Sequence, residues 1–374
     1  MVFGTCIMCV ALETRLAPAA AGLAVSNSFQ ILLFLSLMVR TAASAHDYMS
    51  AVDRVHALSI VPPEPDLPPA AAPRLAADWP AAGEVEFQNV VMSYLPSAPH
   101  VLKGVSFRCQ PGEKVGIVGR TGAGKSSLIM ALFRLAPPDA GAVRIDGVDV
   151  SKLALHDLRQ RIAIIPQEPV MFEGTLRSNL DPFNERADKE LLEALSRCLL
   201  ADMVRGHPEG LLQPVASSGS NYSLGQQQLV CLARAFLNKS RLLLLDEATA
   251  ALDAETDALV QKVVRTAFAD RTILTIAHRL DSIIDSDRVL VMDAGRVAEF
   301  ASPAELLRDE DTIFASLCRQ SGAGSFASLK ATADRHQEVL RRLQAEVRSA
   351  EAERAQMRGE QVAERRSRVD SRSF

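Results

Sequence analysis

A glycine-rich stretch, "GRTGAGKSS", occupies residues 119–127 and contains the residue types needed to hold phosphate. Gly119, Gly122 and Gly124 let the backbone approach a ligand closely, so that successive amides can converge on phosphate oxygens at a helix N-terminus. Lys125 supplies a positive charge for terminal phosphates, and the Ser126 hydroxyl suits Mg²⁺. The remaining candidate contacts in this phosphate loop are Arg120, Thr121, Ala123 and Ser127. The spacing predicts a site for the phosphates of a nucleotide.

Two acids follow an apolar run in "RLLLLDEAT" and could complete such a site. The four leucines predict a buried strand, and ligands bind at the carboxyl ends of strands in open α/β sheets. Asp246 is expected to hold Mg²⁺, with Ser126 as a second ligand. Glu247, one residue further, is expected to act as the general base that polarises the attacking water.

Polar residues close two more predicted strands. Gln167 follows "IAIIP", so its amide is expected to reach the metal or the attacking water, and His278 follows "TILTIA", from where it could donate to the γ-phosphate. Tyr94 lies after the first predicted strand and before the phosphate loop, where its ring could stack on adenine.

The elements that must position these residues predict an α/β domain over residues 83–320. Short apolar runs such as "KVGIVG", "AVRIDG" and "TILTIAH" alternate with stretches of helical periodicity. Strands that alternate with helices indicate a largely parallel sheet.

The chain before this domain has a different character. Residues 16–39 carry no charge, and this run is long enough to span a bilayer. The apolar residues that follow, towards residue 60, recur with helical spacing. Residues 16–39 are therefore expected to span a membrane, with a helical extension after the span; a buried helix or a signal peptide is the alternative reading. Residues 61–82 hold seven prolines, from Pro62 to Pro80, and are expected to form an extended linker.

Composition restricts the partners of the 374-residue chain. Its net charge of −4 gives no general attraction to nucleic acid, so phosphate binding must come from a local site. The six scattered cysteines favour a reducing, cytosolic setting for the domain, and Cys6 and Cys9 lack the further ligands of a zinc site.

The last segment, residues 321–374, is rich in Ala, Glu, Arg and Gln. Apolar residues recur with coiled-coil spacing from Leu340 to Ala350, but Arg354 falls on the next seam position. Two readings stay open, a short coiled-coil arm and a solvated helix or frayed tail.

The order of these motifs, together with "YSLGQ" at residues 222–226 and "AALD" ending at Asp253, resembles the nucleotide-binding domain of an ABC transporter. The resemblance implies a P-loop NTPase fold with a helical subdomain that carries residues 222–226, called the signature. It also implies that the signature contacts ATP held by a second, facing domain. The residues that would do so are Ser223, Leu224, Gly225 and Gln226. The commonest signature is Leu-Ser-Gly-Gly-Gln, so Tyr222 and Leu224 depart from it.

Longer stretches, including "IPQEPVMFEGTLRSNLDPFNE" and "LTIAHRLDSI", are similar to the second nucleotide-binding domain of multidrug-resistance-associated transporters of subfamily C. Residues 22–40 resemble the last membrane helix of those exporters, which implies that residues 1–60 are the end of a transmembrane domain. The resemblance implies ATP and Mg²⁺ as cofactors, a second nucleotide-binding domain and membrane helices as partners, and a membrane location with the domain on the cytoplasmic side. No nucleic-acid partner is expected.

The activity implied is ATP hydrolysis that powers export of a solute. Two alternatives stay open. One is a nucleotide-sensing regulator of a channel, as the sulfonylurea receptors of this subfamily show, and the other is a soluble chromosome- or repair-type ATPase.

Overall fold

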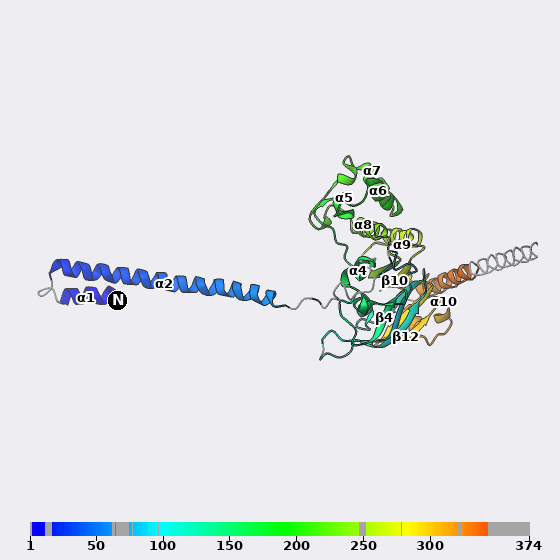
Figure 1. The fold of residues 1–374 in the computed structure, drawn as a ribbon, viewed down its shortest axis with the longest axis horizontal. Helices are drawn as coiled ribbons and strands as arrows, with labels where there is room; N and C mark the ends of the chain where they lie inside the picture. The colour runs from blue at the N-terminus through cyan, green and yellow to red at the C-terminus, as the bar shows by residue number, and fades with distance from the viewer. Residues whose placement is uncertain are drawn as a thin grey trace, which may run out of the picture. The chain divides into compact units, whose positions relative to one another are not determined.

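The computed structural model describes residues 2–11, 17–61, 64, 75–76, 78–95, 97–246, 252–277, 279–320 and 324–342 (Figure 1). The chain divides into two compact units, residues 1–65 and 66–374.

The first unit holds helix α1 (Val2–Ala11) and the 42-residue helix α2 (Pro18–Ser59). Helix α2 starts with proline at its first turn, where a missing N–H costs nothing. Among the described residues it is the one helix long and apolar enough to cross a membrane. At about 1.5 Å per residue it is roughly twice as long as a hydrocarbon core is thick, so only part of it could lie in lipid. The hydroxyl of Ser28 donates to Ala24 O at 2.8 Å within the helix, which satisfies it without an outside partner.

The second unit is built on a six-stranded main sheet in the order β12-β11-β3-β10-β9-β6. Four neighbouring pairs are parallel and only β11–β12 is antiparallel, which confirms the predicted α/β class. The strands are β3 (Lys114–Gly119), β6 (Ala163–Ile165), β9 (Leu242–Asp246), β10 (Thr272–Ile276), β11 (Arg288–Asp293) and β12 (Arg296–Ala301).

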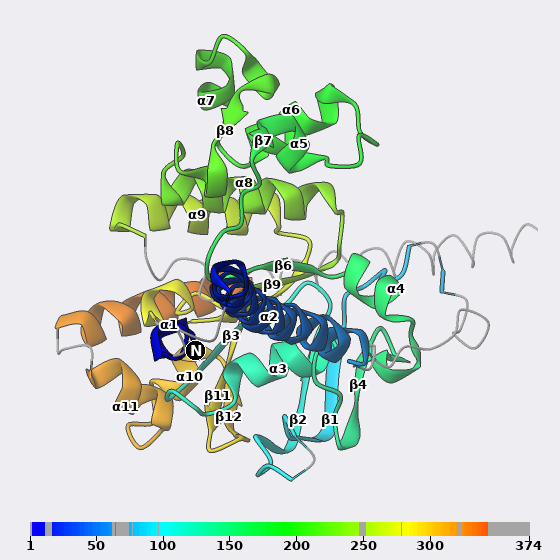
Figure 2. The same cartoon turned by 90° about the vertical axis from the view of Figure 1, so that its left-hand side faces the viewer.

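The leucine run of β9 is buried on both faces of this sheet. Leu242 and Leu244 belong to a cluster that includes helix α3 (Lys125–Leu132), whereas Leu243 and Leu245 belong to a cluster with helix α8 (Leu224–Leu237). Side chains alternate along a strand, so α3 and α8 cover opposite faces of the main sheet, as Figure 2 also shows.

A second, antiparallel sheet closes the cluster around α3. Its order is β2-β1-β4-β5, and its strands are β1 (Val85–Met92), β2 (Leu102–Cys109), β4 (Ala140–Ile145) and β5 (Val148–Asp149). Buried and less buried residues alternate along β1, and the rings of Phe87 and Phe107 stack at 4.6 Å between centroids. One face of this sheet therefore supplies the wall of the core.

The cluster around α8 is the centre of a helical subdomain. Figures 1 and 2 show its outer helices beyond α8 and α9, on the side away from the main sheet. The elements are α5 (Leu176–Leu180), α6 (Asp188–Arg197), α7 (Ala201–Gly206), α9 (Ala254–Ala267), and the short strands β7 (Gly174–Thr175) and β8 (Pro214–Val215).

The rest of the unit contains helix α4 (Leu155–Gln160), α10 (Pro303–Leu306), α11 (Ile313–Gln320) and a helix over residues 324–342. Single 3₁₀ turns lie at Val150–Lys152, Gly210–Leu212, Ser217–Gly219 and Leu280–Ser282. In the last helix, Leu329 and Ala333 are buried against Phe314 and Cys318 of α11. The first part of the predicted tail thus packs on the domain, while most of the predicted coiled-coil seam lies outside the described residues.

The end of the proline-rich linker also contacts the domain. Trp79 is buried in the core cluster of the two sheets, and its indole Nε1 donates to Ile145 O at 3.3 Å. Arg161 donates to Trp79 O at 2.8 Å, and the Asp146 carboxylate accepts from the N–H groups of Ala82 and Glu84. These bonds fix the point at which the chain enters β1.

Candidate functional site: a nucleotide site and a signature helix

The phosphate loop connects β3 to α3, as the sequence predicts. Gly119 ends β3 with φ of 150°, and a Cβ at this position would lie 2.2 Å from Met292 O of the neighbouring strand β11. Gly124 caps α3 with φ of 100°, a left-handed conformation that side chains rarely adopt. The loop can therefore follow this path only with glycine at both positions.

Lys125 is the first residue of α3 and is only 6% exposed. Its Nζ donates to Gly119 O at 2.9 Å and to Arg120 O at 3.4 Å, so the ammonium group lies within the turn of the loop. A buried ammonium group needs polar partners, and the phosphate loop supplies carbonyl groups for it. This position places a positive charge where the backbone amides of α3 begin.

Tyr94 lies beside Ser127 of the phosphate loop. Ser127 is buried, and the hydroxyls of Tyr94 and Ser127 are 2.8 Å apart. Tyr94 is 52% exposed, and Ser126 is exposed at the start of α3. Tyr94 is thus held beside the phosphate loop, and its stacking on adenine stays a prediction.

The strand ends predicted to meet are brought to one edge of the main sheet. Asp246 ends β9 directly beside Ile276 of β10, and Ile165 of β6 pairs with Leu245. Gln167 follows two residues after β6 and is exposed. Glu247 and His278 lie outside the described residues, but each is the next residue after a described position at this edge, Asp246 and Ala277.

The candidate Mg²⁺ ligands are the Ser126 hydroxyl, the Gln167 amide and the Asp246 carboxylate. All offer oxygen, which Mg²⁺ prefers, and Mg²⁺ commonly takes one or two protein ligands while phosphates and waters fill the remaining positions. Within the described part of the chain no group of three His, Cys, Asp or Glu side chains could hold a metal alone. These three oxygen donors are of the type that a nucleotide-bound Mg²⁺ uses, and their coordination of Mg²⁺ stays a prediction.

The signature forms the start of α8, on the face of the main sheet opposite to α3. The Ser223 hydroxyl accepts from Gln226 N at 3.2 Å and the Gln226 side chain accepts from Ser223 N at 2.9 Å, a reciprocal capping box. Ser223 is exposed, whereas Tyr222 is buried in the subdomain core. The first position of the signature thus has a packing role, which accommodates tyrosine.

Gly225 is required by the contact between α8 and α9. A Cβ at Gly225 would lie 2.1 Å from Cγ2 of Thr256, far inside van der Waals contact. The neighbouring Leu224 is 40% exposed at the helix start. The departure at Leu224 therefore puts a branched apolar side chain on the surface where the sequence expects contact with a partner.

Three residues that the sequence analysis did not single out tie α8 to the Gln167 segment. Gln228 is 2% exposed, and its Nε2 donates to Gln167 O at 3.2 Å. Arg234 donates to Val170 O at 2.5 Å and to Asn179, whose side chain in turn bonds the backbone at residue 172. An arginine inside the apolar run "LVCLARAFL" was a signal, because a charge buried on a helix needs partners.

Comparison with known proteins shows which family and which relatives this chain resembles. The family model described as ABC transporter matches residues 102–250. The chain is 48% identical over 314 residues to a multidrug resistance-associated protein of Drosophila melanogaster, covering 83% of this chain and 23% of that protein. It is 45% identical over 314 residues to ATP-binding cassette sub-family C member 2 of Rattus norvegicus, covering 84% of this chain and 20% of that protein.

Among solved structures, a bacterial Atm1-family ABC exporter with ATP bound is similar with a TM-score of 0.64 and 33% identity, covering 81% of this chain and 52% of that one. The chain spans between a fifth and a quarter of the length of these two curated relatives.

The phosphate loop, the acid-ended strand β9 and the signature helix on an α/β sheet define the class, a nucleotide-binding ATPase domain of ABC type. The chain contains an ABC transporter domain, matched over residues 102–250, and over most of its length it is similar to the multidrug-resistance-associated proteins of subfamily C.

Proposed function

We propose that residues 83–320 bind and hydrolyse Mg-ATP, and that hydrolysis powers export of a solute across a membrane, as the C-terminal nucleotide-binding part of a longer subfamily C transporter. One observation carries the proposal. The main sheet brings the phosphate loop, Asp246, and the strand ends that lead into Glu247 and His278 to a single edge. The similar Atm1-family exporter, whose structure contains ATP, supports the same ligand.

In this mechanism the amides of residues 119–127 and the N-terminus of α3 bind the phosphates, and Lys125 neutralises their charge. Ser126, Asp246 and Gln167 would hold Mg²⁺, which when bound offsets the charge that develops during phosphoryl transfer. Glu247 accepts the proton of the attacking water, and His278 donates to the γ-phosphate. Tyr94 stacks on adenine.

The partner is a second nucleotide-binding domain, in the same longer chain or in another one. Ser223, Leu224, Gly225 and Gln226 would contact ATP held by that domain, which is supported by the exposure of Ser223 and Leu224 on the face opposite to α3. Binding would draw the domains together and hydrolysis would release them, which moves membrane helices between two states. The domain would lie on the cytoplasmic side of the membrane, with no nucleic acid as partner.

A regulatory role is the second candidate, favoured by one observation. Leu224 replaces a glycine of the commonest signature and is 40% exposed. A bulkier residue there would weaken closure over the partner's ATP. The domain would then still bind nucleotide but hydrolyse it slowly, as a regulator does.

The test is ATP hydrolysis by the full chain in lipid nanodiscs. Lys125→Ala should abolish Mg-ATP binding, whereas Glu247→Gln should keep binding and reduce turnover by about 100-fold or more, as loss of a general base does. Lys152→Ala and Glu255→Gln are matched controls at exposed positions and should behave as wild type. A Glu247→Gln variant with normal turnover refutes the general-base role, and a wild-type chain that binds Mg-ATP without steady hydrolysis favours the regulatory role.

A further inference from the structure

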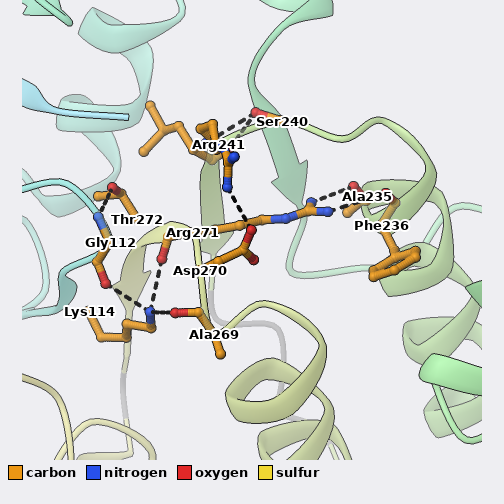
Figure 3. A network of polar contacts seen from close by, with 11 residues as sticks. Gly112, Lys114, Ala235, Phe236, Ser240, Arg241, Ala269, Asp270, Arg271 and Thr272 are labelled. Carbon is orange, nitrogen blue, oxygen red and sulfur yellow. Dashed lines mark hydrogen bonds and ion pairs between the residues drawn. The ribbon is translucent and has the colours of Figure 1, made fainter. Parts of the chain in front are cut away.

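The signature helix α8 is anchored at the end opposite to the signature. Its last carbonyl groups have no partners within the helix, and they form its negative end. The guanidinium of Arg271 donates to Ala235 O at 3.0 Å and to Phe236 O at 3.3 Å. Figure 3 shows this side chain extended from the turn before β10 to the end of α8. The contact joins α8 to the main sheet at a point remote along the helix from Ser223.

Arg271 is buried, and its surroundings supply the partners that a buried cation needs. The side chain is 7% exposed, and its guanidinium lies 4.7 Å from the ring centroid of Phe268 and 5.5 Å from that of Phe236. Burial lowers the pKa of this group. A desolvated guanidinium is unfavourable unless its donors and its faces find partners, and here both do.

A second cation connects Arg271 to the strand of the phosphate loop. Nζ of Lys114 donates to Arg271 O at 3.0 Å, to Ala269 O at 2.6 Å and to Gly112 O at 2.8 Å (Figure 3). Lys114 is the first residue of β3, and Gly119 is its last. A continuous set of bonds thus runs from the start of β3, through the turn at residues 269–271, to the end of α8.

We propose that Arg271 is a positioning residue that sets the direction of α8 relative to β3, so that the signature faces the ATP of the partner domain. This inference rests on the proposed function of the signature. Helix α8 has 14 residues and is about 21 Å long at 1.5 Å per residue, so a tilt of about 5° about the anchored end moves Ser223 by about 2 Å. A misplacement of that size is enough to impair catalysis strongly.

The test compares Arg271→Met and Arg271→Lys with wild type in the full chain. Arg241→Met is the matched control, because Arg241 belongs to the same network through Asp270 but donates to no carbonyl of α8 among the bonds described. Three quantities are measured: the dissociation constant of Mg-ATP, the turnover number, and the distance between spin labels on α8 and on β2.

For the distance measurement alone, labels are placed at Leu224→Cys and Lys103→Cys, two exposed positions, whereas binding and turnover are measured on chains that keep Leu224 and Lys103. Cys6 and Cys9 are replaced by serine, since Cys6 is exposed, and the other cysteines are buried. All variants carry this background, so that differences report the substitution at residue 271 or 241 alone.

Arg271→Met should leave the Mg-ATP dissociation constant within about twofold, widen the distance distribution and lower the turnover number at least about tenfold. Arg271→Lys should be intermediate, because lysine keeps the charge but lacks the planar fork. Arg241→Met should match wild type.

An unchanged distance distribution in Arg271→Met overturns the inference, as does a loss of ATP affinity that parallels the loss of turnover. If wild type hydrolyses no ATP, the proposed function fails, yet the distance distribution still decides the role of Arg271. If Arg271→Met does not fold, Arg271→Lys carries the same comparison, and a wild-type distribution in that variant counts against the inference.

Discussion

Replacing Gly225 by alanine should separate α8 from α9, and the structure sets the size of the effect. The new Cβ would lie 2.1 Å from Thr256 Cγ2 and 3.3 Å from Thr256 Cβ. Thr256 is β-branched and has little rotamer freedom in a helix, and its N–H is already bonded to the capping carboxylate of Asp253 at 3.0 Å. Neither side can yield without moving a helix. Overpacking of this kind costs about 1–3 kcal/mol.

The assay is thermal unfolding, in which a domain of this size loses roughly 2–4 °C per kcal/mol, so Gly225→Ala should lower the midpoint by about 5 °C. Thr256→Ser removes only the clashing methyl group and keeps the hydroxyl. By itself it should cost about 1 kcal/mol, but in the Gly225→Ala background it should restore stability, which gives a coupling energy of about 1–2 kcal/mol. Equal midpoints for wild type and Gly225→Ala, or strictly additive effects, would refute the reasoning.

Two further predictions follow from buried polar groups. Asn179→Ala removes one acceptor of the Arg234 guanidinium and both side-chain bonds to the backbone of Phe172, so urea unfolding should show a loss of about 2–4 kcal/mol, whereas the exposed control Asn221→Ala should lose less. For Asp287, burial acts to raise the pKa, but His336 at 3.9 Å and a hydrogen bond from Lys114 N lower it overall. Because the pKa of Asp287 is depressed in the folded state, its ionised carboxylate stabilises the fold above the unfolded pKa of about 4, and this contribution is lost as the pH falls further. In Asp287→Asn the thermal unfolding midpoint should therefore change less between about pH 5 and pH 2.5 than it does in wild type. A wild-type pH profile in that variant would contradict the assignment.

The parts of the site that are local in sequence could be predicted. The phosphate loop needs glycines, lysine and serine at fixed spacing on one turn, so residues 119–127 identify it without any distant contact. The convergence of Asp246 with the β10 end also follows, because the carboxyl ends of parallel strands share an edge.

Contacts between distant residues could not be predicted in the same way. Trp79 is the single tryptophan in a proline-rich stretch, and its partner Ile145 is 66 residues away. Arg271 and Lys114 bind backbone carbonyls, and every residue type carries a carbonyl, so the sequence contains no pattern that marks the acceptors. The need for glycine at residue 225 depends on where α9 returns beside α8, which tertiary packing decides.

The central claim is that the phosphate loop of one domain acts with the signature of another, and a mixing experiment tests it most directly. Lys125→Ala abolishes ATP binding by the phosphate loop, and Ser223→Arg blocks the signature with a bulky charged side chain. Each variant alone should hydrolyse no ATP. When the Ser223→Arg chain is mixed with an excess of the Lys125→Ala chain, ATP hydrolysis should return, because the intact phosphate loop of the first chain meets the intact signature of the second. If wild-type chains hydrolyse ATP but the mixture stays as inactive as its components, loop and signature act within one chain and the account is contradicted.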